Sequence, residues 1–131
     1  MNKANEILKN NELTESVLDL MEKASTAIME VYEKPLSEVS IKDDDTPVTK
    51  ADLAANRILQ DGLKNLFPEI PIVSEEDEFS LNIPKTKKVF WLIDPLDGTK
   101  EFIKKNDEFT CNLALIENNI STLGFVSVPV R

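Results

Sequence analysis

The spacing of apolar residues changes near Pro68 and Pro71, and this change constrains the fold more than any other feature of the chain. Before it, apolar residues recur at steps of three and four; after it, they form runs of strand length. Amphipathic helices and buried strands have these two patterns. We therefore predict an α+β fold in which two helices pack on one face of a mainly antiparallel sheet.

The first long helix is expected to begin at Asn11, as its N-cap, and to end near Glu33. Residues 1–12 carry a weaker pattern, which leaves open a short extra helix or a loose extension. We therefore treat residues 1–12 as an N-terminal extension and residues 13–131 as one domain. A single apolar stripe along the helix should face the sheet: Val17, Leu20, Met21, Ala24, Ile28, Val31 and Tyr32.

The second helix is expected to run from Thr49 to Leu66, with Pro68 as a stop signal. Thr49 as N-cap and Asp52 three residues later would form a capping box. Asp52 alone is explained by that capping role, without any part in chemistry.

Apolar runs after Pro71 predict the strands. The segment Glu117–Ile120 between the last two is a predicted hairpin turn. No helix is predicted after the last strand, so one sheet face is expected to be uncovered and open to self-association, as in part of a larger fold. The predicted strands are Ile70–Val73, Val89–Ile93, Phe109–Ile116 and Ser121–Val128.

The absence of histidine excludes several kinds of catalysis at once. Nucleophiles activated by histidine, histidine zinc sites and histidine acid–base catalysis all need that side chain. Hydrolytic chemistry in this chain must use carboxylates, hydroxyls and metals that prefer oxygen ligands, namely Mg²⁺, Mn²⁺ or Ca²⁺.

The net charge of −9 disfavours nucleic-acid binding through a basic face. No apolar run approaches the length of a membrane span, and the first residues lack a signal-peptide core. The single cysteine, Cys111, fits a reducing compartment. We expect a cytoplasmic protein, free or peripheral to a membrane.

The segment from Asp94 to Thr99 reads Asp-Pro-Leu-Asp-Gly-Thr and directly follows an apolar run. Pro95 favours a turn that would fold Asp94 and Asp97 toward each other, where a cation between them would relieve their repulsion. Gly98 allows close approach of the backbone, and Thr99 can open a helix whose N–H groups bind an anion. Two interpretations remain open: a polar turn between strand and helix, or a cation site beside a phosphate site.

Further acids follow the first predicted strand, at Glu75 and Glu76. Strand ends of one sheet share a rim, so Glu75 can meet Asp94 and Asp97 there. With the Leu96 carbonyl and water, these oxygens would make a partial octahedral shell. Glu75 alone is better explained as a solvated loop residue.

Three ordered segments of the chain, residues 44–56, 71–77 and 91–103, resemble the inositol monophosphatase superfamily. The resemblance is closest to its CysQ-type 3′(2′),5′-bisphosphate nucleotidase branch, and Lys100-Glu101-Phe102 favours that branch. It extends over residues 13–131 and implies the N-terminal half of a layered α-β-α-β-α fold. Family members are longer, and their second half supplies a further aspartate and most nucleoside contacts.

The resemblance implies a site for two or more Mg²⁺ ions, with the second ion's site incomplete in this chain. Glu75, Asp94 and the Leu96 carbonyl would bind the first Mg²⁺, and Asp94 with Asp97 would bind the second. Asp52 and Thr99 would be the catalytic pair that orients and deprotonates the attacking water. The substrate would meet Glu75, Leu96, Asp97, Gly98 and Thr99.

The implied activity is hydrolysis of 3′-phosphoadenosine 5′-phosphate, a small phosphorylated nucleotide, to AMP and phosphate during sulfur assimilation. One alternative is the same chemistry on inositol monophosphate or another sugar phosphate. Another is a catalytically inert fragment that binds a metal or a partner chain.

Overall fold

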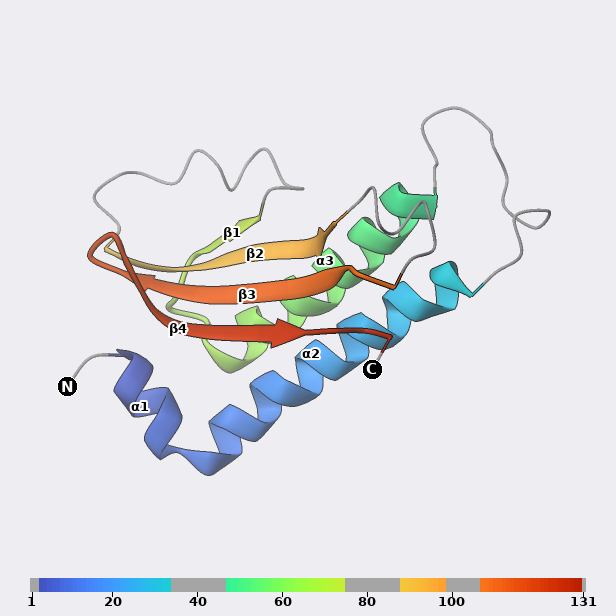
Figure 1. Cartoon of the computed structure of the whole chain (residues 1–131). Helices are drawn as coiled ribbons and strands as arrows, with labels where there is room; N and C mark the ends of the chain where they lie inside the picture. The colour runs from blue at the N-terminus through green and yellow to red at the C-terminus, as the bar shows by residue number, and fades with distance from the viewer. Residues whose placement is uncertain (1–2, 34–46, 75–87, 99–106, 131) are drawn as a thin grey trace.

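The computed structural model describes residues 3–33, 47–74, 88–98 and 107–130, except the side chains of residues 47–49. The helices and strands are distributed as the period change predicts, with helices before Pro68 and strands after it (Figure 1). They are α1 (Lys3–Lys9), α2 (Asn11–Tyr32), α3 (Pro47–Leu66), β1 (Ile72–Ser74), β2 (Val89–Asp97), β3 (Thr110–Glu117) and β4 (Ile120–Ser127).

The four strands form one sheet in the order β1-β2-β3-β4. β1 is parallel to β2, and the other two pairs are antiparallel. Helices α2 and α3 lie along one face of this sheet (Figure 1). The predicted α+β class, with helices on one face of a mainly antiparallel sheet, is confirmed.

Helix α2 confirms the first predicted helix but corrects its cap. The N-cap is Asn10, whose backbone is extended and whose Oδ1 accepts a hydrogen bond from the Leu13 N–H at 3.2 Å. Asn11 already lies in the helix, so its assignment as N-cap was wrong. The predicted stripe faces the core, with five members buried: Val17, Met21, Ala24, Ile28 and Tyr32.

Helix α3 begins at Pro47, two residues before the predicted cap. Proline suits the first helical position, because its fixed φ fits a helix and its missing N–H would have no partner there. Thr49 therefore lies inside the first turn, and Asp52 lies in the second turn, too far along to cap. The predicted capping box was wrong, and the burial of Asp52 needs another reason.

The core lies between the two long helices and the sheet. The helices approach closely at Gly62 of α3, where a Cβ would collide with the Leu20 side chain of α2. Burying each large apolar side chain contributes about 1.5–3 kcal/mol. Those that are fully buried include Ile28, Leu59, Leu63, Trp91, Ile93, Leu113 and Leu115.

Strand β3 alternates strictly between the two faces of the sheet. Cys111, Leu113, Leu115 and Glu117 are buried on the helix side. The alternate residues are all partly exposed on the other side, which we call the open face: Thr110, Asn112, Ala114 and Ile116.

The predicted hairpin between β3 and β4 is present, with a turn tighter than expected. Asn118 and Asn119 have φ angles of 52° and 68°. Two consecutive residues with positive φ make the type I′ turn that matches the twist of paired strands, and asparagine tolerates that conformation. The hairpin is therefore specified by its two asparagines.

Residues 3–9 form helix α1, the short helix that the sequence analysis left open. This helix packs against the turn end of the hairpin, at Glu117. The buried Glu117 carboxylate accepts a hydrogen bond from the Lys3 backbone N–H at 2.7 Å, and Thr122 Oγ1 donates to its second oxygen. Ala4 and Ile7 are the residues of α1 whose side chains are buried. Burial opposes ionisation of Glu117, but these hydrogen bonds outweigh it and lower its pKa.

We predict that Glu117→Gln destabilises the chain at pH 7 by about 1.5–3 kcal/mol, because the charged acceptor of the α1 N–H groups is lost. A lowered folded-state pKa also means that this stabilisation is present above the ordinary pKa of 4.5 and disappears as the pH falls below it. Urea unfolding from pH 7 to pH 3 measures both effects.

The matched control is Glu15→Gln on the exposed side of α2, which should change stability by less than about 0.5 kcal/mol. Equal stability of Glu117→Gln and this control at pH 7 would contradict the role assigned to Glu117.

Candidate functional site

A β-bulge in β2 brings Asp94 and Asp97 to one face of the sheet. Asp94 pairs with Asn112 and Asp97 pairs with Thr110, so three steps along β2 match two steps along β3. Residues three apart in a regular strand point to opposite faces, whereas the extra residue of a bulge restores the same face. Both carboxylates therefore lie on the open face, about 7 Å apart along the strand.

Side-chain contacts agree with this placement. Asn112 Nδ2 donates to Asp97 Oδ2 at 3.5 Å and to Thr110 Oγ1 at 3.2 Å. Asp97 is exposed, and Asp94 is partly buried. The open face thus carries a polar group of two carboxylates, an amide and a hydroxyl at one end of the β2–β3 ladder.

The expected turn after Ile93 was wrong, because β2 continues through Asp97. Proline is tolerated in a strand where its missing N–H costs no ladder bond, as at a bulge. Pro95 lies inside the bulge and beyond Ile93, where the described pairing of β1 with β2 ends. The two aspartates therefore share a face through a bulge, and not through a turn.

Asp52 approaches the same end of the sheet from the helix side, with 6% of its surface exposed. One turn further along α3, Asn56 Oδ1 accepts a hydrogen bond from Ser74 Oγ at 2.6 Å. Residues four apart share a helix face, so this bond fixes Asp52 near the carboxyl end of β1. That end lies beside Ile93 of β2, the residue before Asp94.

Cys111 connects these acids electrostatically. Burial, followed by the negative charges of Asp94 and Asp52, raises the pKa of its thiol to about 12. The Asp94 and Asp52 carboxylates therefore both act on the buried Cys111 thiol, which places Asp52 on the same part of the sheet as Asp94. Asp94 and Asp97 thus share the open face, and Asp52 lies on the helix side of the sheet, where it and Asp94 both act on Cys111.

Two residues at the end of the motif complete what the structure describes of the site. Leu96 is buried at the bulge, and Gly98 has a φ of 95°, which favours glycine. Glu75 and Thr99 lie outside the described residues. Ser74, directly before Glu75, is paired with Ile93, directly before Asp94.

The chemistry of the donor set fits a hard cation, because it consists of carboxylate, amide and hydroxyl oxygens. Within the described ranges, no three His, Cys, Asp or Glu side chains are placed to enclose a metal ion. Asp94 and Asp97 alone would therefore make only part of a coordination shell, and a further ligand such as the predicted Glu75 would have to complete it.

Sequence reasoning missed Asn112, Asn56 and Ser74. Asn112 interrupts an otherwise apolar run, and this interruption was a usable signal. Asn56 and Ser74 gave no such signal, because their hydrogen bond joins two segments that are distant in sequence.

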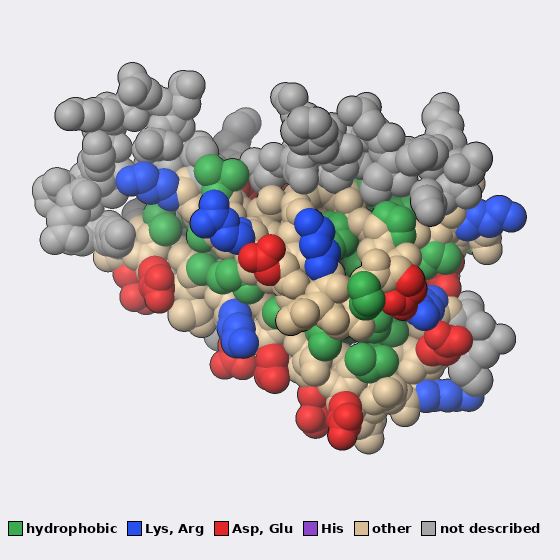
Figure 2. All heavy atoms as spheres, turned by 180° about the vertical axis from the view of Figure 1, so that it is seen from behind, with side chains coloured by type: hydrophobic (Ala, Val, Ile, Leu, Met, Phe, Trp, Pro, Cys, Tyr) green, Lys and Arg blue, Asp and Glu red, His purple; other side chains and the backbone are tan. Residues whose placement is uncertain are grey.

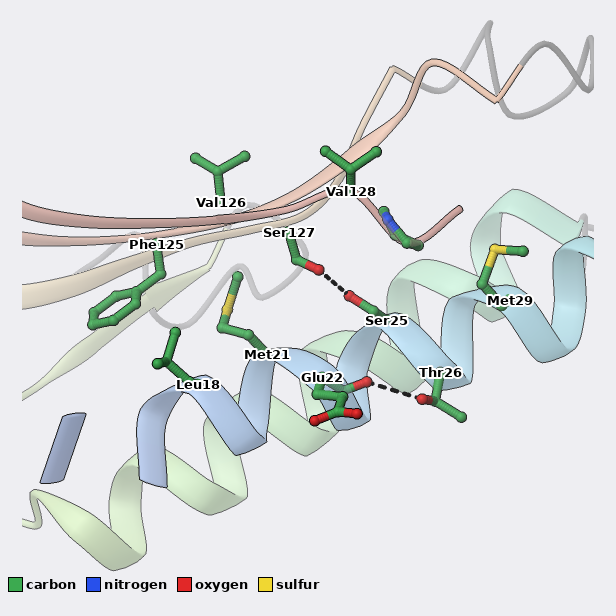
Figure 3. Close-up of a pocket in the computed structure, with 11 residues that line it drawn as sticks. Leu18, Met21, Glu22, Ser25, Thr26, Met29, Phe125, Val126, Ser127 and Val128 are labelled. Atoms are coloured by element: carbon green, nitrogen blue, oxygen red, sulfur yellow. Dashed lines mark hydrogen bonds between the residues drawn. The ribbon is translucent and has the colours of Figure 1, made fainter. Parts of the chain in front are cut away.

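A groove of about 730 Å³ lies elsewhere, between α2 and β4. Leu18, Met21 and Phe125 line one end of it, and Ser25 and Ser127 share a hydrogen bond within it (Figure 3). Glu22 is the single acid among its described lining residues, so the groove offers no pair of carboxylates and we do not assign the cation chemistry to it.

Both signs of charge are present on the described surface. In the view from behind, Lys or Arg side chains and Asp or Glu side chains are interspersed over the described atoms (Figure 2). On this face, the described side chains form no basic stripe of the kind that nucleic-acid-binding proteins present. Among the helices that the structure describes, none combines the length and apolar character of a membrane span.

Comparison with known proteins identifies relatives of both sequence and fold. The sequence pattern of the inositol monophosphatase family matches residues 9–131. The 3′(2′),5′-bisphosphate nucleotidase CysQ of Salmonella typhimurium is 49% identical over 120 residues, which are 90% of this chain and 48% of that protein. The Haemophilus influenzae CysQ is 37% identical over 122 residues, covering 92% and 45% of the two chains.

Solved structures give the same result. CysQ from Bacteroides thetaiotaomicron has a TM-score of 0.75 at 35% identity, covering 95% of this chain and 45% of that one. Inositol monophosphatase II from Staphylococcus aureus has a TM-score of 0.74 at 22% identity, covering 92% and 44%, and shows the fold alone. The chain spans about half the length of the curated relatives it matches.

We predict that Cys111 does not react with a thiol reagent in the folded chain at pH 8. Its side chain is fully buried and its pKa lies near 12, so neither access nor thiolate is available. Ellman's reagent should label it at least about 100-fold faster in denaturing urea. Rapid labelling without urea, in a sample whose circular dichroism shows the folded state, would contradict this placement of Cys111.

Proposed function

The chain belongs to the inositol monophosphatase family, and we propose that it is part of a Mg²⁺-dependent 3′(2′),5′-bisphosphate nucleotidase. It would hydrolyse 3′-phosphoadenosine 5′-phosphate to AMP and phosphate, in the cytoplasm and in support of sulfur assimilation. The observation that carries the proposal is the bulge that turns Asp94 and Asp97 to one face. The CysQ relatives supply the substrate class.

The residues that would hold the cations are those at the bulge and at the end of β1. Glu75, Asp94 and the Leu96 carbonyl would bind one Mg²⁺, and Asp94 with Asp97 would bind another. Bound Mg²⁺ lowers the pKa of water, neutralises phosphate oxygens and stabilises the leaving oxygen. This chemistry needs no histidine, in agreement with the composition of the chain.

The remaining site residues would handle a proton and the phosphate. Asp52, with Thr99, would orient the attacking water and accept its proton. A buried carboxylate is suited to such a role, because it is shielded from water and the neighbouring Asn56 is fixed by its hydrogen bond with Ser74. Gly98 would let backbone N–H groups approach the phosphate without a side chain in the way.

The alternative substrate is inositol monophosphate or another small sugar phosphate. The fold alone does not separate these, since inositol monophosphatases share it at 20–30% identity. The nucleotide is favoured because relatives at 37–49% identity are CysQ proteins.

A catalytically inert fragment that binds a metal or a partner chain is the remaining alternative. It is favoured by the incomplete coordination shell among the described residues and by the half-length coverage of the relatives. Under this alternative, the chain would self-associate through the open face. Under the leading proposal, residues 13–131 would be part of one phosphatase domain.

We predict that Asp94→Asn abolishes nucleotidase activity. A suitable protein is the Salmonella relative in which the 120 matched residues are replaced by those of this chain. Loss of a carboxylate that would hold both cations should lower kcat/KM by about 100-fold or more, or about 3 kcal/mol of transition-state stabilisation. Phosphate release from 3′-phosphoadenosine 5′-phosphate with Mg²⁺ measures it.

Asp61→Asn, on the exposed surface of α3, is the matched control and should retain activity. If Asp94→Asn and Asp61→Asn are equally active, the assignment of Asp94 fails. An inactive replacement protein that is folded and binds Mg²⁺ would favour the inert fragment.

We also predict a preference for the nucleotide over inositol monophosphate in the same replacement protein. The ratio of the two kcat/KM values measures discrimination between substrates directly. A ratio that favours inositol monophosphate would transfer the proposal to the alternative substrate while leaving the cation site in place.

A further inference from the structure

Asn112 is a polar residue on an otherwise apolar stretch of β3, and it faces the acids. In register it lies between Asp94 on β2 and Val126 on β4. Val126 is apolar and 70% exposed. The polar neighbours of Asn112 across the strands are therefore on the side of the aspartates.

The contacts of Asn112 use its side-chain amide nitrogen. Nδ2 carries two hydrogens, and its two described contacts are Thr110 Oγ1 at 3.2 Å and Asp97 Oδ2 at 3.5 Å. Thr110 is opposite Asp97 in register, so the three side chains form one group on the open face. The contact with Thr110 fixes the direction in which the amide points.

Resting on the proposed function, we propose that Asn112 is a positioning residue of the cation site. Its amide, oriented by Thr110, holds Oδ2 of Asp97 and leaves Oδ1 to face a cation shared with Asp94. Asn112 thus acts through Asp97 and does not itself take part in the reaction.

The chemistry of an amide suits this role. Asp97 is exposed, and an exposed carboxylate loses rotamer freedom when it binds a cation. A hydrogen bond that restricts the carboxylate beforehand reduces that loss. Lysine or arginine at this position would also restrict it but would compete with the cation by charge, whereas the neutral amide does not.

The test uses the 131-residue chain and Tb³⁺ as a probe for an oxygen-ligand cation site. The single tryptophan, Trp91, lies three residues before Asp94, so emission sensitised by Trp91 reports a cation bound near that aspartate. Competition with Mg²⁺ converts the signal into a magnesium affinity. Circular dichroism and thermal unfolding of each variant check that it is folded.

Asn112→Leu keeps the approximate size of the side chain and removes the amide, and it should weaken Tb³⁺ and Mg²⁺ binding about 10-fold, as loss of a hydrogen bond to a metal ligand does. Thr110→Val, which removes the hydroxyl that orients the amide, should weaken binding less. Asn112→Asp, which places a third carboxylate opposite Asp94, should strengthen Tb³⁺ binding and lower the stability of the cation-free chain.

A double-mutant cycle separates positioning from packing. In the Asp97→Asn background, Asn112→Leu should have no further effect on cation affinity, because its effect passes through the Asp97 carboxylate. Additive losses would overturn the proposal. So would an unchanged affinity in folded Asn112→Leu, or the absence of Trp91-sensitised emission from the unaltered chain.

If Asn112→Leu does not fold, Thr110→Val decides: weaker binding supports the proposal and unchanged binding overturns it. Failure of the nucleotidase assay with an intact Asn112–Asp97 coupling would reject the substrate and keep this inference. Nucleotidase activity without that coupling would reject this inference and keep the substrate.

Discussion

The site depends on one extra residue in β2. Without the bulge, the alternation of a strand would send Asp94 and Asp97 to opposite sides of the sheet, one toward solvent and one into the helix-covered core. With it, both reach the open face, and Pro95 lies within the bulge, where a central strand tolerates proline. The pairing of the two carboxylates on one face is therefore a direct result of the bulge.

Hydrogen bonds between different elements fix the two long helices relative to the bulge. The hydrogen bond between Asn56 and Ser74 fixes α3 against the end of β1, and this fixes Asp52 beneath the ladder that carries Asp94. Just before β3, Asp107 Oδ1 accepts a hydrogen bond from Tyr32 Oη at 2.6 Å, and this bond fixes the segment that leads into β3 against the end of α2. The buried acid, the bulge and the following strand are each held by a polar contact between different elements.

Local chemistry predicted the elements of this fold well. The helices follow from their 3.6-residue period, and the hairpin follows from two adjacent asparagines. The bulge was not predictable in the same way, because Asp-Pro-Leu-Asp-Gly suits a turn equally well and only pairing with β3 decides between them. Likewise Thr49 fits a cap by local pattern, but Pro47 starts the helix earlier. The untested members of the site, Glu75 and Thr99, remain predictions.

The bond between Lys3 and Glu117 has a consequence for how the chain folds. It joins residues 114 positions apart, so α1 cannot complete its contacts until the β3–β4 hairpin exists. Closing so long a loop costs entropy that only later packing repays. Docking of α1 should therefore be among the last events of folding, and its release among the first events of unfolding.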